Sequence, residues 1–270
     1  MPELPEIETL LRGLAPELRD RAVARVTVRE RRLRGGVAAD FAAHLVGRRF
    51  GDPHRRGKYL LVPLDDGRVW LIHLGMTGRM TLASSDRPDE RHDHVVVELD
   101  DGRLLTYNDA RRFGRLAILE AESVARETGE GLDPLAPTFT PAAVFALTRA
   151  RRTSIKALLM DQRRVAGLGN IYVNEILFRA RIRPRRRAAR LRLADCVRLV
   201  RATRTVLAAA IRAGGSSISD YRDGRGQPGW FQLRHQVYDR RGKPCRRCAT
   251  PIRAQVVVGR SSFYCPRCQR

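Results

Sequence analysis

Residues 245–268 read CRRCATPIRAQVVVGRSSFYCPRC. The segment holds two Cys-x2-Cys pairs, Cys245 with Cys248 and Cys265 with Cys268, and 16 residues separate the pairs. This spacing predicts one tetrahedral zinc site in which four thiolates complete the coordination shell, so that the metal is structural. Four unrelated thiols are the alternative, which the paired spacing disfavours.

The chain between the two cysteine pairs predicts a β-hairpin. Residues 254–258 and 262–264 are its expected strands, and Gly259-Arg260 is the expected turn. Together with the metal site, this hairpin defines a zinc ribbon. Cys196 stands alone in a helical apolar pattern, and we interpret it as a core thiol.

The charge balance points to a polyanionic partner. The 270 residues include 52 Lys and Arg against 29 Asp and Glu, a formal net charge of +23. Nucleic acid is the leading candidate, because basic residues along a whole chain neutralise phosphates and release their counterions. The alternative is an arginine-rich surface with no partner, which accounts for only part of the excess.

The N-terminal half reads as a helix followed by strands. Residues 5–18 carry apolar side chains at helical spacing, whereas residues 24–119 contain short β-type runs such as 59–62, 69–72 and 94–97. Asp65-Asp66-Gly67 and Asp100-Asp101-Gly102 are typical hairpin turns. The expected fold is an antiparallel β-sandwich or barrel with a flanking helix, within an α+β multidomain protein.

Beyond a Gly-, Pro- and Thr-rich linker at residues 128–140, the apolar period becomes helical. Thr140-Pro141 predicts a helix start, and Gly214-Gly215 predicts the end of the last long helix. The other expected helices are 154–161, 170–180 and 193–213. The expected domains are therefore 1–127, 141–235 with a loop at 216–232, and the zinc ribbon at 236–270.

Several short motifs occur in one order along the chain. They are MPELPE at 1–6, RGK at 56–58, HLGMTG at 73–78, DARRFG at 109–114, GLGNIY at 167–172 and the terminal zinc ribbon. In this order the chain resembles bacterial formamidopyrimidine-DNA glycosylases over essentially its whole length. The resemblance implies an N-terminal β-sandwich, a helix-two-turn-helix domain and a zinc ribbon.

The resemblance implies a bifunctional base-excision-repair enzyme that removes oxidised purines and then cuts the strand by β,δ-elimination. Removal of Met1 would make Pro2 the amine nucleophile that forms a Schiff base with the sugar. Glu3 would be its proton donor. Lys58 and Arg260 would bind phosphates and act as the proton donors of β- and δ-elimination. Taken alone, Pro2 and Glu3 also fit an ordinary acidic helix start.

The family pattern also implies a set of DNA-contacting residues. Met76, Arg111 and Phe113 would fill the space that a flipped nucleotide leaves, with Arg111 facing the orphaned cytosine. Core packing is the alternative for Met76 and Phe113. The remaining expected DNA contacts are Asn170, Lys156 and His92, and for the last two a solvated surface position is an equal alternative.

Two further features follow from the resemblance. The loop at 216–232 would recognise the damaged base, although a plain surface loop is the alternative. Glu175 would support the catalytic pocket, although a helix cap or a salt bridge is equally consistent with its sequence position.

The expected partner is double-stranded DNA containing oxidised purines or abasic sites, with one structural Zn²⁺ as cofactor. The chain has no run of 18 apolar residues and its first residues are acidic, so we expect a cytoplasmic protein. The resemblance further implies a bacterial, nucleoid-associated monomer. Two other functions remain open: the sister branch that acts on oxidised pyrimidines, and a non-catalytic zinc-ribbon DNA-binding protein.

Overall fold

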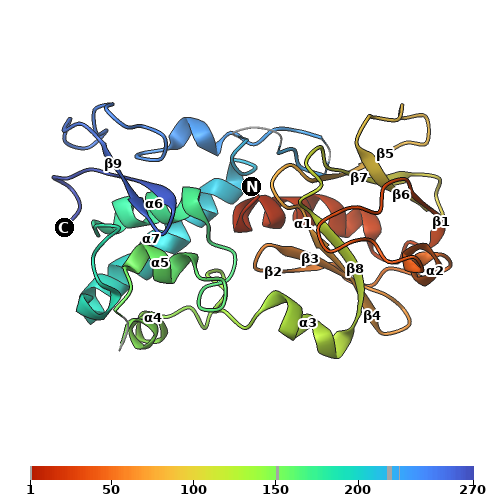
Figure 1. Cartoon of the computed structure of the whole chain (residues 1–270), viewed down its shortest axis with the longest axis horizontal. Coiled ribbons are helices and arrows are strands. Elements are labelled where there is room, and N and C mark those ends of the chain that lie inside the picture. The colour runs from red at the N-terminus through yellow and green to blue at the C-terminus, as the bar shows by residue number, and fades with distance from the viewer. Residues whose placement is uncertain (1, 150–151, 218–220, 225) are drawn as a thin grey trace. The chain divides into compact units, whose positions relative to one another are not determined.

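The computed structural model describes residues 2–149, 152–217, 221–224 and 226–270. These residues form two compact units (Figure 1). Unit 1 comprises Met1–Thr128 and Ala213–Gln232, and unit 2 comprises Gly129–Arg212 and Leu233–Arg270. No helix among the described residues combines the length and the apolar character that crossing a bilayer requires.

Unit 1 contains two four-stranded antiparallel sheets, as the β-sandwich prediction requires. Their strand orders are β1-β6-β7-β5 and β2-β3-β4-β8. The strands are β1 (Val23–Val28), β2 (His54–Arg56), β3 (Tyr59–Pro63), β4 (Arg68–His73), β5 (Arg79–Ala83), β6 (Asp93–Leu99), β7 (Leu104–Asn108) and β8 (Arg115–Glu120). The helices of this unit are α1 (Leu4–Leu18), α2 (Phe41–Leu45) and α3 (Ala121–Thr128).

Both predicted hairpin turns are present in unit 1. Residues 65–67 join β3 to β4, with Leu61 opposite Leu71, and residues 100–102 join β6 to β7, with Val97 opposite Leu105. These four residues are buried, so the register places apolar side chains inside the unit.

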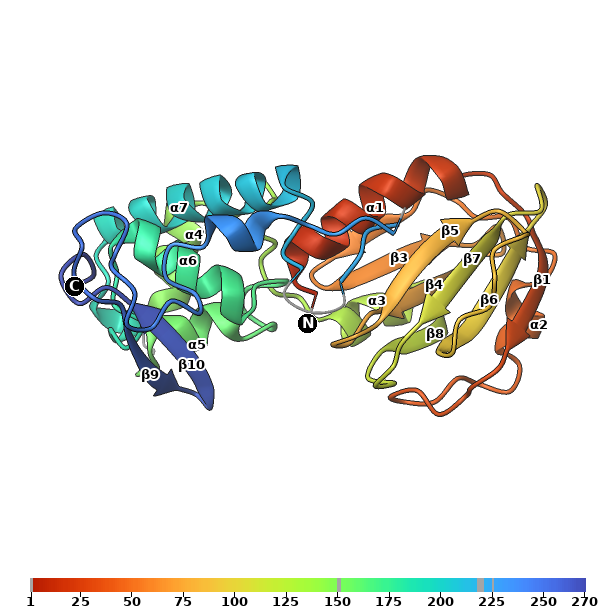
Figure 2. The ribbon, with the colours of Figure 1, turned by 90° about the horizontal axis from the view of Figure 1, so that it is seen from above.

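Helix α1 packs against β2 and β3 (Figure 2). Its apolar stripe is fully buried and consists of Leu4, Ile7, Leu10, Leu14 and Leu18. The stripe was predicted from its spacing, and burying it fixes the helix on the unit-1 core. The N-terminal residues that precede the helix are thereby held at a defined place.

Unit 2 is mainly helical. Its helices are α4 (Pro141–Thr148), α5 (Ile155–Met160), α6 (Asn170–Ala180) and α7 (Leu193–Arg212), with a short 3-10 turn at Ala188–Arg190. Thr140 and Ser154 cap α4 and α5, since their hydroxyls accept hydrogen bonds from Ala143 and Ala157. Helix α6 contacts both α7 and the zinc-ribbon strand β10 (Arg260–Tyr264).

The zinc-ribbon hairpin confirms the predicted architecture but corrects its turn. Strand β9 (Arg253–Val257) pairs with β10 so that Val257 lies opposite Arg260. The turn is therefore Val258-Gly259, whose φ angles of 50° and 65° are those a two-residue hairpin turn needs. We had expected Arg260 in the turn, but it is the first residue of β10. Its side chain is exposed.

Two segments group differently from the sequence-based boundaries. Residues 129–140, expected as a linker, pack within unit 2, where Leu132 forms a parallel bridge with Val165 and Phe139 is fully buried. Residues 213–232, expected with the helical domain, group with unit 1. Helices α2 and α3 were not predicted: α2 is a short pattern within the β-rich region, and α3 is a short pattern that directly follows it.

Candidate active site, zinc site and nucleic-acid interface

Pro2 and Glu3 lie at the start of α1 and are buried. Glu3 is only 3% exposed, and its backbone N–H donates a hydrogen bond of 2.8 Å to Glu6 Oε2. This bond satisfies one of the amide groups that a helix start leaves without an intrahelical partner. The predicted nucleophile and proton donor are thus neighbours on a rigid element.

Glu6 connects the N-terminal segment to the loop predicted for damage recognition. Its Oε1 accepts a 2.7 Å hydrogen bond from the Ser216 N–H, and its carbonyl accepts one of 3.0 Å from the Tyr221 hydroxyl. Gly215 has φ +84°, and a Cβ there would lie 2.8 Å from Glu6 Oε1. Sequence reasoning did not assign Glu6 a role, although the i, i+3 spacing of Glu3 and Glu6 is the signal of a capping box.

Lys58 lies in the turn between β2 and β3 and is 7% exposed. His73, at the end of β4, is nearby in the same sheet. Burial lowers the pKa of His73 to about 4, and the positive charge of Lys58 acts in the same direction. The imidazole is consequently neutral near neutral pH, and the positive charge around it comes from Lys58, Arg34 and Arg115.

Met76 and Phe113 lie on two loops of unit 1, between β4 and β5 and between β7 and β8. Their exposed fractions are 38% and 41%, which excludes the core-packing alternative. The guanidinium of Arg111 stacks over the Phe113 ring at 4.5 Å from its centroid. A cavity of about 620 Å³ adjoins Arg111 and Phe113.

Asp109 holds these two loops together. It is fully buried, and its carboxylate accepts hydrogen bonds from the Gly114 N–H at 2.8 Å and from the hydroxyls of Tyr107 and Thr77. The Thr77 hydroxyl in turn accepts the Arg111 N–H at 3.1 Å. One carboxylate therefore fixes both loop backbones. Asp109 is the first residue of the DARRFG motif, but its sequence position does not indicate that it holds the two loops.

His92 is half-buried and lies beside the Arg111 loop, because its carbonyl accepts the Asp109 N–H at 3.1 Å. Its ring lies 6.1 Å from that of His94. His92 is therefore only partly solvated, and its DNA contact stays a prediction.

Lys156 of unit 2 is completely buried, which excludes the solvated-surface alternative. Its Nζ donates hydrogen bonds to Asn170 Oδ1 at 2.6 Å, to the Ser261 carbonyl at 2.9 Å and to the Ser262 hydroxyl at 2.7 Å. The Lys156 amine, which we had expected to contact DNA directly, instead forms these hydrogen bonds inside unit 2. Lys156 fastens the first residue of α6 to β10.

A second bridge joins the same two elements. Asn174 Nδ2 donates to the Asn170 carbonyl at 2.6 Å, and Asn174 Oδ1 accepts the Phe263 N–H at 2.8 Å. Asn170 and Arg260 are two of the predicted phosphate ligands. They lie on α6 and β10, which these hydrogen bonds join within unit 2. At the N-terminus of α6, backbone N–H groups and the helix dipole favour an anion beside Asn170.

The sequence position of Glu175 suggested a helix cap or a salt bridge as alternatives. Among the described residues it forms neither. It is buried, and its carboxylate accepts the N–H groups of Gln236, Val237 and Tyr238 at 2.8 to 3.0 Å. Burial raises the pKa of Glu175, and the three N–H donors oppose that rise. Glu175 anchors the segment that leads into the zinc ribbon.

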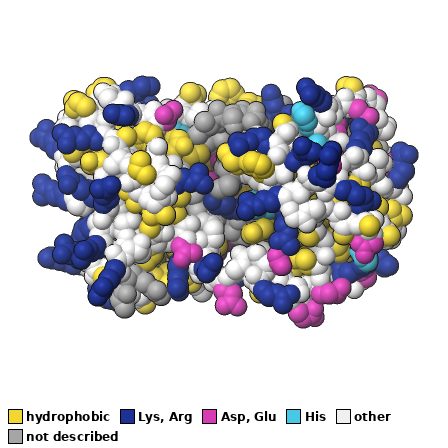
Figure 3. All heavy atoms as spheres, viewed as in Figure 1, with side chains coloured by type: hydrophobic (Ala, Val, Ile, Leu, Met, Phe, Trp, Pro, Cys, Tyr) yellow, Lys and Arg dark blue, Asp and Glu magenta, His cyan; other side chains and the backbone are white. Residues whose placement is uncertain are grey.

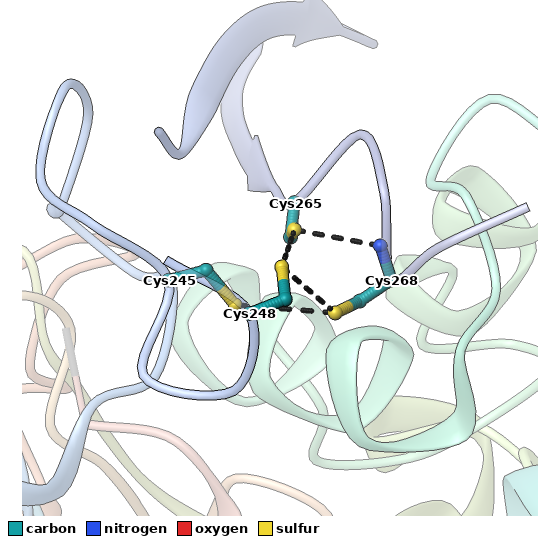
Figure 4. Close-up of side chains that lie close together, drawn as sticks. All are labelled: Cys245, Cys248, Cys265 and Cys268. Carbon is teal, nitrogen blue, oxygen red and sulfur yellow. Dashed lines mark hydrogen bonds between the residues drawn. The ribbon is translucent and has the colours of Figure 1, made fainter. Parts of the chain in front are cut away.

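The four ribbon cysteines converge with their sulfur atoms turned toward one another (Figure 4). Their ligand atoms all lie within 4.8 Å of one another, and the Cys248 Sγ lies 3.5 Å from that of Cys265 and 3.4 Å from that of Cys268. Zinc–sulfur bonds of about 2.3 Å in a tetrahedron place sulfurs about 3.8 Å apart, so the set fits Zn²⁺. Cys196 lies elsewhere, fully buried in the core as predicted.

Removing one zinc ligand should abolish the ribbon. We expect Cys248→Ser to lose bound zinc and to weaken DNA binding at least about tenfold, because structural zinc contributes roughly 10–16 kcal/mol in zinc-finger peptides. Strand β10, which carries Arg260, ends at the residue before Cys265. Zinc content and the dissociation constant for an abasic-site duplex are the measurements. Cys196→Ser is the matched control and should retain both, whereas normal DNA binding by zinc-free Cys248→Ser would contradict the assignment.

Three domain profiles match successive parts of the chain. The formamidopyrimidine-DNA glycosylase N-terminal domain matches residues 1–116, and the formamidopyrimidine-DNA glycosylase H2TH domain matches residues 131–222. The zinc finger found in FPG and IleRS matches residues 242–270.

A relative named formamidopyrimidine-DNA glycosylase, from Syntrophotalea carbinolica, is 46% identical over 272 residues, which cover the whole of both chains. The chain belongs to the formamidopyrimidine-DNA glycosylase family. This confirms the resemblance inferred from the motifs, the three-part fold and the one structural zinc site of the family's ribbon.

Solved structures of formamidopyrimidine-DNA glycosylases share this fold. The Lactococcus lactis Fpg in complex with DNA containing an abasic site superimposes with a TM-score of 0.90 at 32% identity, covering 99% of each chain. The complex of Lactococcus lactis FPG (MutM) with DNA containing Fapy-dG gives the same TM-score and identity, covering 99% of this chain and 100% of that one.

Proposed function

We propose that the chain is a bifunctional DNA glycosylase and abasic-site lyase that excises oxidised purines, 8-oxoguanine and formamidopyrimidines, from duplex DNA. The observation that carries this proposal is the buried Pro2-Glu3 pair at the start of α1, in a chain whose relatives bind Fapy-dG and abasic-site DNA. Position alone gives Pro2 its chemistry. Once Met1 is removed, Pro2 carries a free secondary amine.

In the first step the Pro2 nitrogen attacks C1′ of the damaged nucleotide. The C1′–N bond breaks, and the base leaves with the bonding electrons and takes up a proton. An unperturbed α-amino group has a pKa of about 7.7–8.0, so a useful fraction is neutral near pH 7. Glu3 protonates the ring oxygen as the C1′–O4′ bond opens, and the sugar is then held as an iminium ion on Pro2.

The iminium ion makes the C2′ proton acidic. Loss of that proton expels the 3′ phosphate in β-elimination, and loss of the C4′ proton then expels the 5′ phosphate in δ-elimination. Lys58 and Arg260 serve as proton donors to the two departing phosphates. Water finally hydrolyses the iminium bond and regenerates the Pro2 amine.

Unit 2 supplies phosphate contacts in this proposal. Asn170 binds a phosphate at the N-terminus of α6, where the helix dipole adds to the attraction. Lys156 acts as a positioning residue, since its buried amine holds both Asn170 and β10. His92 lies beside the Arg111 loop and contributes a further DNA contact from unit 1.

Glu6 supports damage recognition by residues 216–232. Its carboxylate binds the Ser216 N–H and also orients the Glu3 backbone. Residues 218–220 and 225 of this loop lie outside the described residues, and the described part that Glu6 holds can present backbone N–H groups to the carbonyl of an oxidised purine. The same carboxylate therefore serves both the recognition loop and the nucleophile's helix start.

Met76, Arg111 and Phe113 fill the stack when the nucleotide is flipped out. Their exposure on loops that Asp109 fixes supports this assignment. Arg111→Ala should narrow the preference for 8-oxoguanine opposite cytosine over the same lesion opposite adenine. A good bidentate base contact is worth roughly 1–3 kcal/mol, so the ratio of excision rates should fall about 5- to 150-fold.

The measurement is single-turnover excision on both duplexes, together with lyase activity on a preformed abasic site. Abasic-site cleavage should change much less, because it bypasses base recognition. Arg112→Ala, at the neighbouring exposed arginine, is the matched control. An unchanged cytosine-over-adenine ratio in Arg111→Ala would remove Arg111 as the reader of the orphaned base.

The whole proposal is tested by borohydride trapping on an 8-oxoguanine:cytosine duplex. Reduction of the iminium ion should give a covalent protein–DNA adduct. Mass spectrometry should place the attached DNA on Pro2, in protein that lacks Met1. The competing function, a non-catalytic DNA-binding protein, predicts tight binding with no trapped adduct. A duplex with an oxidised pyrimidine distinguishes the sister branch, which would be trapped faster on that substrate.

A further inference from the structure

Unit 2 contains a cavity of about 1110 Å³ that the proposed function leaves unused. It is formed by the C-terminal end of α6, by α7 and by the zinc ribbon, and Cys248 and Cys268 are part of its wall. Its volume lies slightly above the usual range for ligand sites, roughly 300–1,000 Å³. Eight arginines line it, including Arg179, Arg181, Arg201, Arg267 and Arg270.

Most of these guanidinium groups have no acidic partner. Asp195 forms ion pairs with Arg186 and with Arg198, so these two arginines share one acidic partner. The other five arginines named above are exposed, and none of them forms an ion pair with any residue that the structure describes. Arg247 stacks over Phe178, with its guanidinium carbon 5.0 Å from the ring centroid.

The zinc site offsets only part of this charge. A Zn²⁺ ion with four thiolates carries two net negative charges, and Asp195 adds one, so the lining keeps a clear positive excess. Like charges around a concave surface focus the potential and attract a counter-ion. Figure 3 shows Lys and Arg side chains gathered at the left edge of the view, where the C-terminus lies in Figure 1.

The cavity is separate from the phosphate-binding residues assigned above. Asn170 is the first residue of α6, whereas Arg179 lies at its far end, about 14 Å away at 1.5 Å per residue. Arg260 begins β10, but the lining cysteines and arginines of the ribbon belong to its metal-binding end. A phosphate at Asn170 therefore does not occupy this cavity.

We propose that this arginine-lined cavity is a second anion site, which binds backbone phosphates of a DNA segment other than the one that carries the lesion. Guanidinium groups bind phosphate oxygens in bidentate fashion, and they stay charged at every physiological pH. Contact with a second segment would let the enzyme pass between DNA segments without complete release. Such a site would also account for part of the excess of basic over acidic residues in the chain.

Charge density favours DNA over an acidic peptide as the occupant. Duplex DNA presents one charge per roughly 1.7 Å of its axis, whereas an extended peptide presents at most one per roughly 3.3 Å. A cavity with this many unpaired arginines matches the denser polyanion. A free polyphosphate shares the same phosphate chemistry, and the experiment separates it from DNA.

The test uses the full-length zinc-loaded protein, saturated with a short duplex that contains an uncleavable abasic analogue. A labelled, undamaged duplex is then added, and fluorescence anisotropy and native mass spectrometry report its binding. We expect a complex of one protein with two duplexes. Arg201→Gln combined with Arg267→Gln should weaken binding of the second duplex about tenfold and reduce the slope of log K against log salt by about two.

The matched control is Arg126→Gln combined with Arg163→Gln, which removes the same charge from exposed positions outside the cavity. It should leave second-duplex binding within about twofold of wild type, and both double variants should keep normal zinc content and base excision. Equal weakening by the control, or no second duplex bound, overturns the proposal. Tripolyphosphate or an aspartate-rich peptide that binds more tightly than the duplex overturns DNA as the occupant.

Discussion

Replacing Glu3 with glutamine should lower the rate of base excision about 10²- to 10⁴-fold, the usual contribution of a general acid. The amide has nearly the shape of the carboxyl group but cannot donate the proton that opens the sugar ring. The Glu3 side chain takes part in the capping box of α1, but the glutamine amide oxygen can still accept the same backbone N–H, so the helix start should remain intact. Single-turnover release of 8-oxoguanine is the measurement.

Glu8→Gln is the matched control, because it makes the same chemical change on the same helix. Glu8 pairs with the exposed Arg12 and with the largely buried Arg55, so its loss should lower stability but affect excision by folded protein little. The thermal midpoint of each variant separates misfolding from lost catalysis. If Glu3→Gln turned over at the wild-type rate, Glu3 would have no place in the mechanism.

Replacing Pro2 with glycine should reduce both base excision and strand cleavage about 100-fold or more, while binding to an abasic-site duplex persists. A primary amine gives an imine that must gain a proton before it becomes an electron sink, whereas the secondary amine of proline gives a cationic iminium directly. The ring also fixes the amine, and small displacements of a reacting group cost about 10²-fold. Borohydride-trapped adduct and cleaved strand are measured on the same duplex.

Leu4 provides a control for disturbance of the helix start. It is fully buried, so Leu4→Val should lower stability without removing the amine. Its trapping rate, measured on folded protein, should remain near wild type. A wild-type trapping rate for Pro2→Gly would show that the proline ring is not essential to the nucleophile.

Local sequence signals predicted the elements that carry most of these residues. The hairpin turns at 65–67 and 100–102, the bounds of α6 and the cap at Thr140 all follow from turn and capping chemistry within a few residues. The paired cysteine spacing predicted the metal site for the same reason: two short loops each bring two thiolates together. Such features are local, so no distant partner has to be known.

The prediction of the ribbon turn shows where local reasoning ends. Glycine at 259 suggested the turn position, but Val258 adopts a positive φ as well, which moves the turn by one residue and places Arg260 on the strand. A β-branched residue rarely adopts that conformation. The pairing of the two strands, which the zinc site brings together, decides the register.

Composition and motif order, by themselves, determined the fold class, the family, the metal ligands and the basic character of the chain. Only the tertiary structure decided what the buried polar residues do. Lys156 looked like a surface cation but is fully buried against Asn170 and β10, and Glu6 and Asp109 form hydrogen bonds that hold loop residues of unit 1. A buried charge must be satisfied by hydrogen bonds, and its partners here lie up to 210 residues away in the chain. Spacing along a sequence cannot specify such partners, because folding alone brings them together.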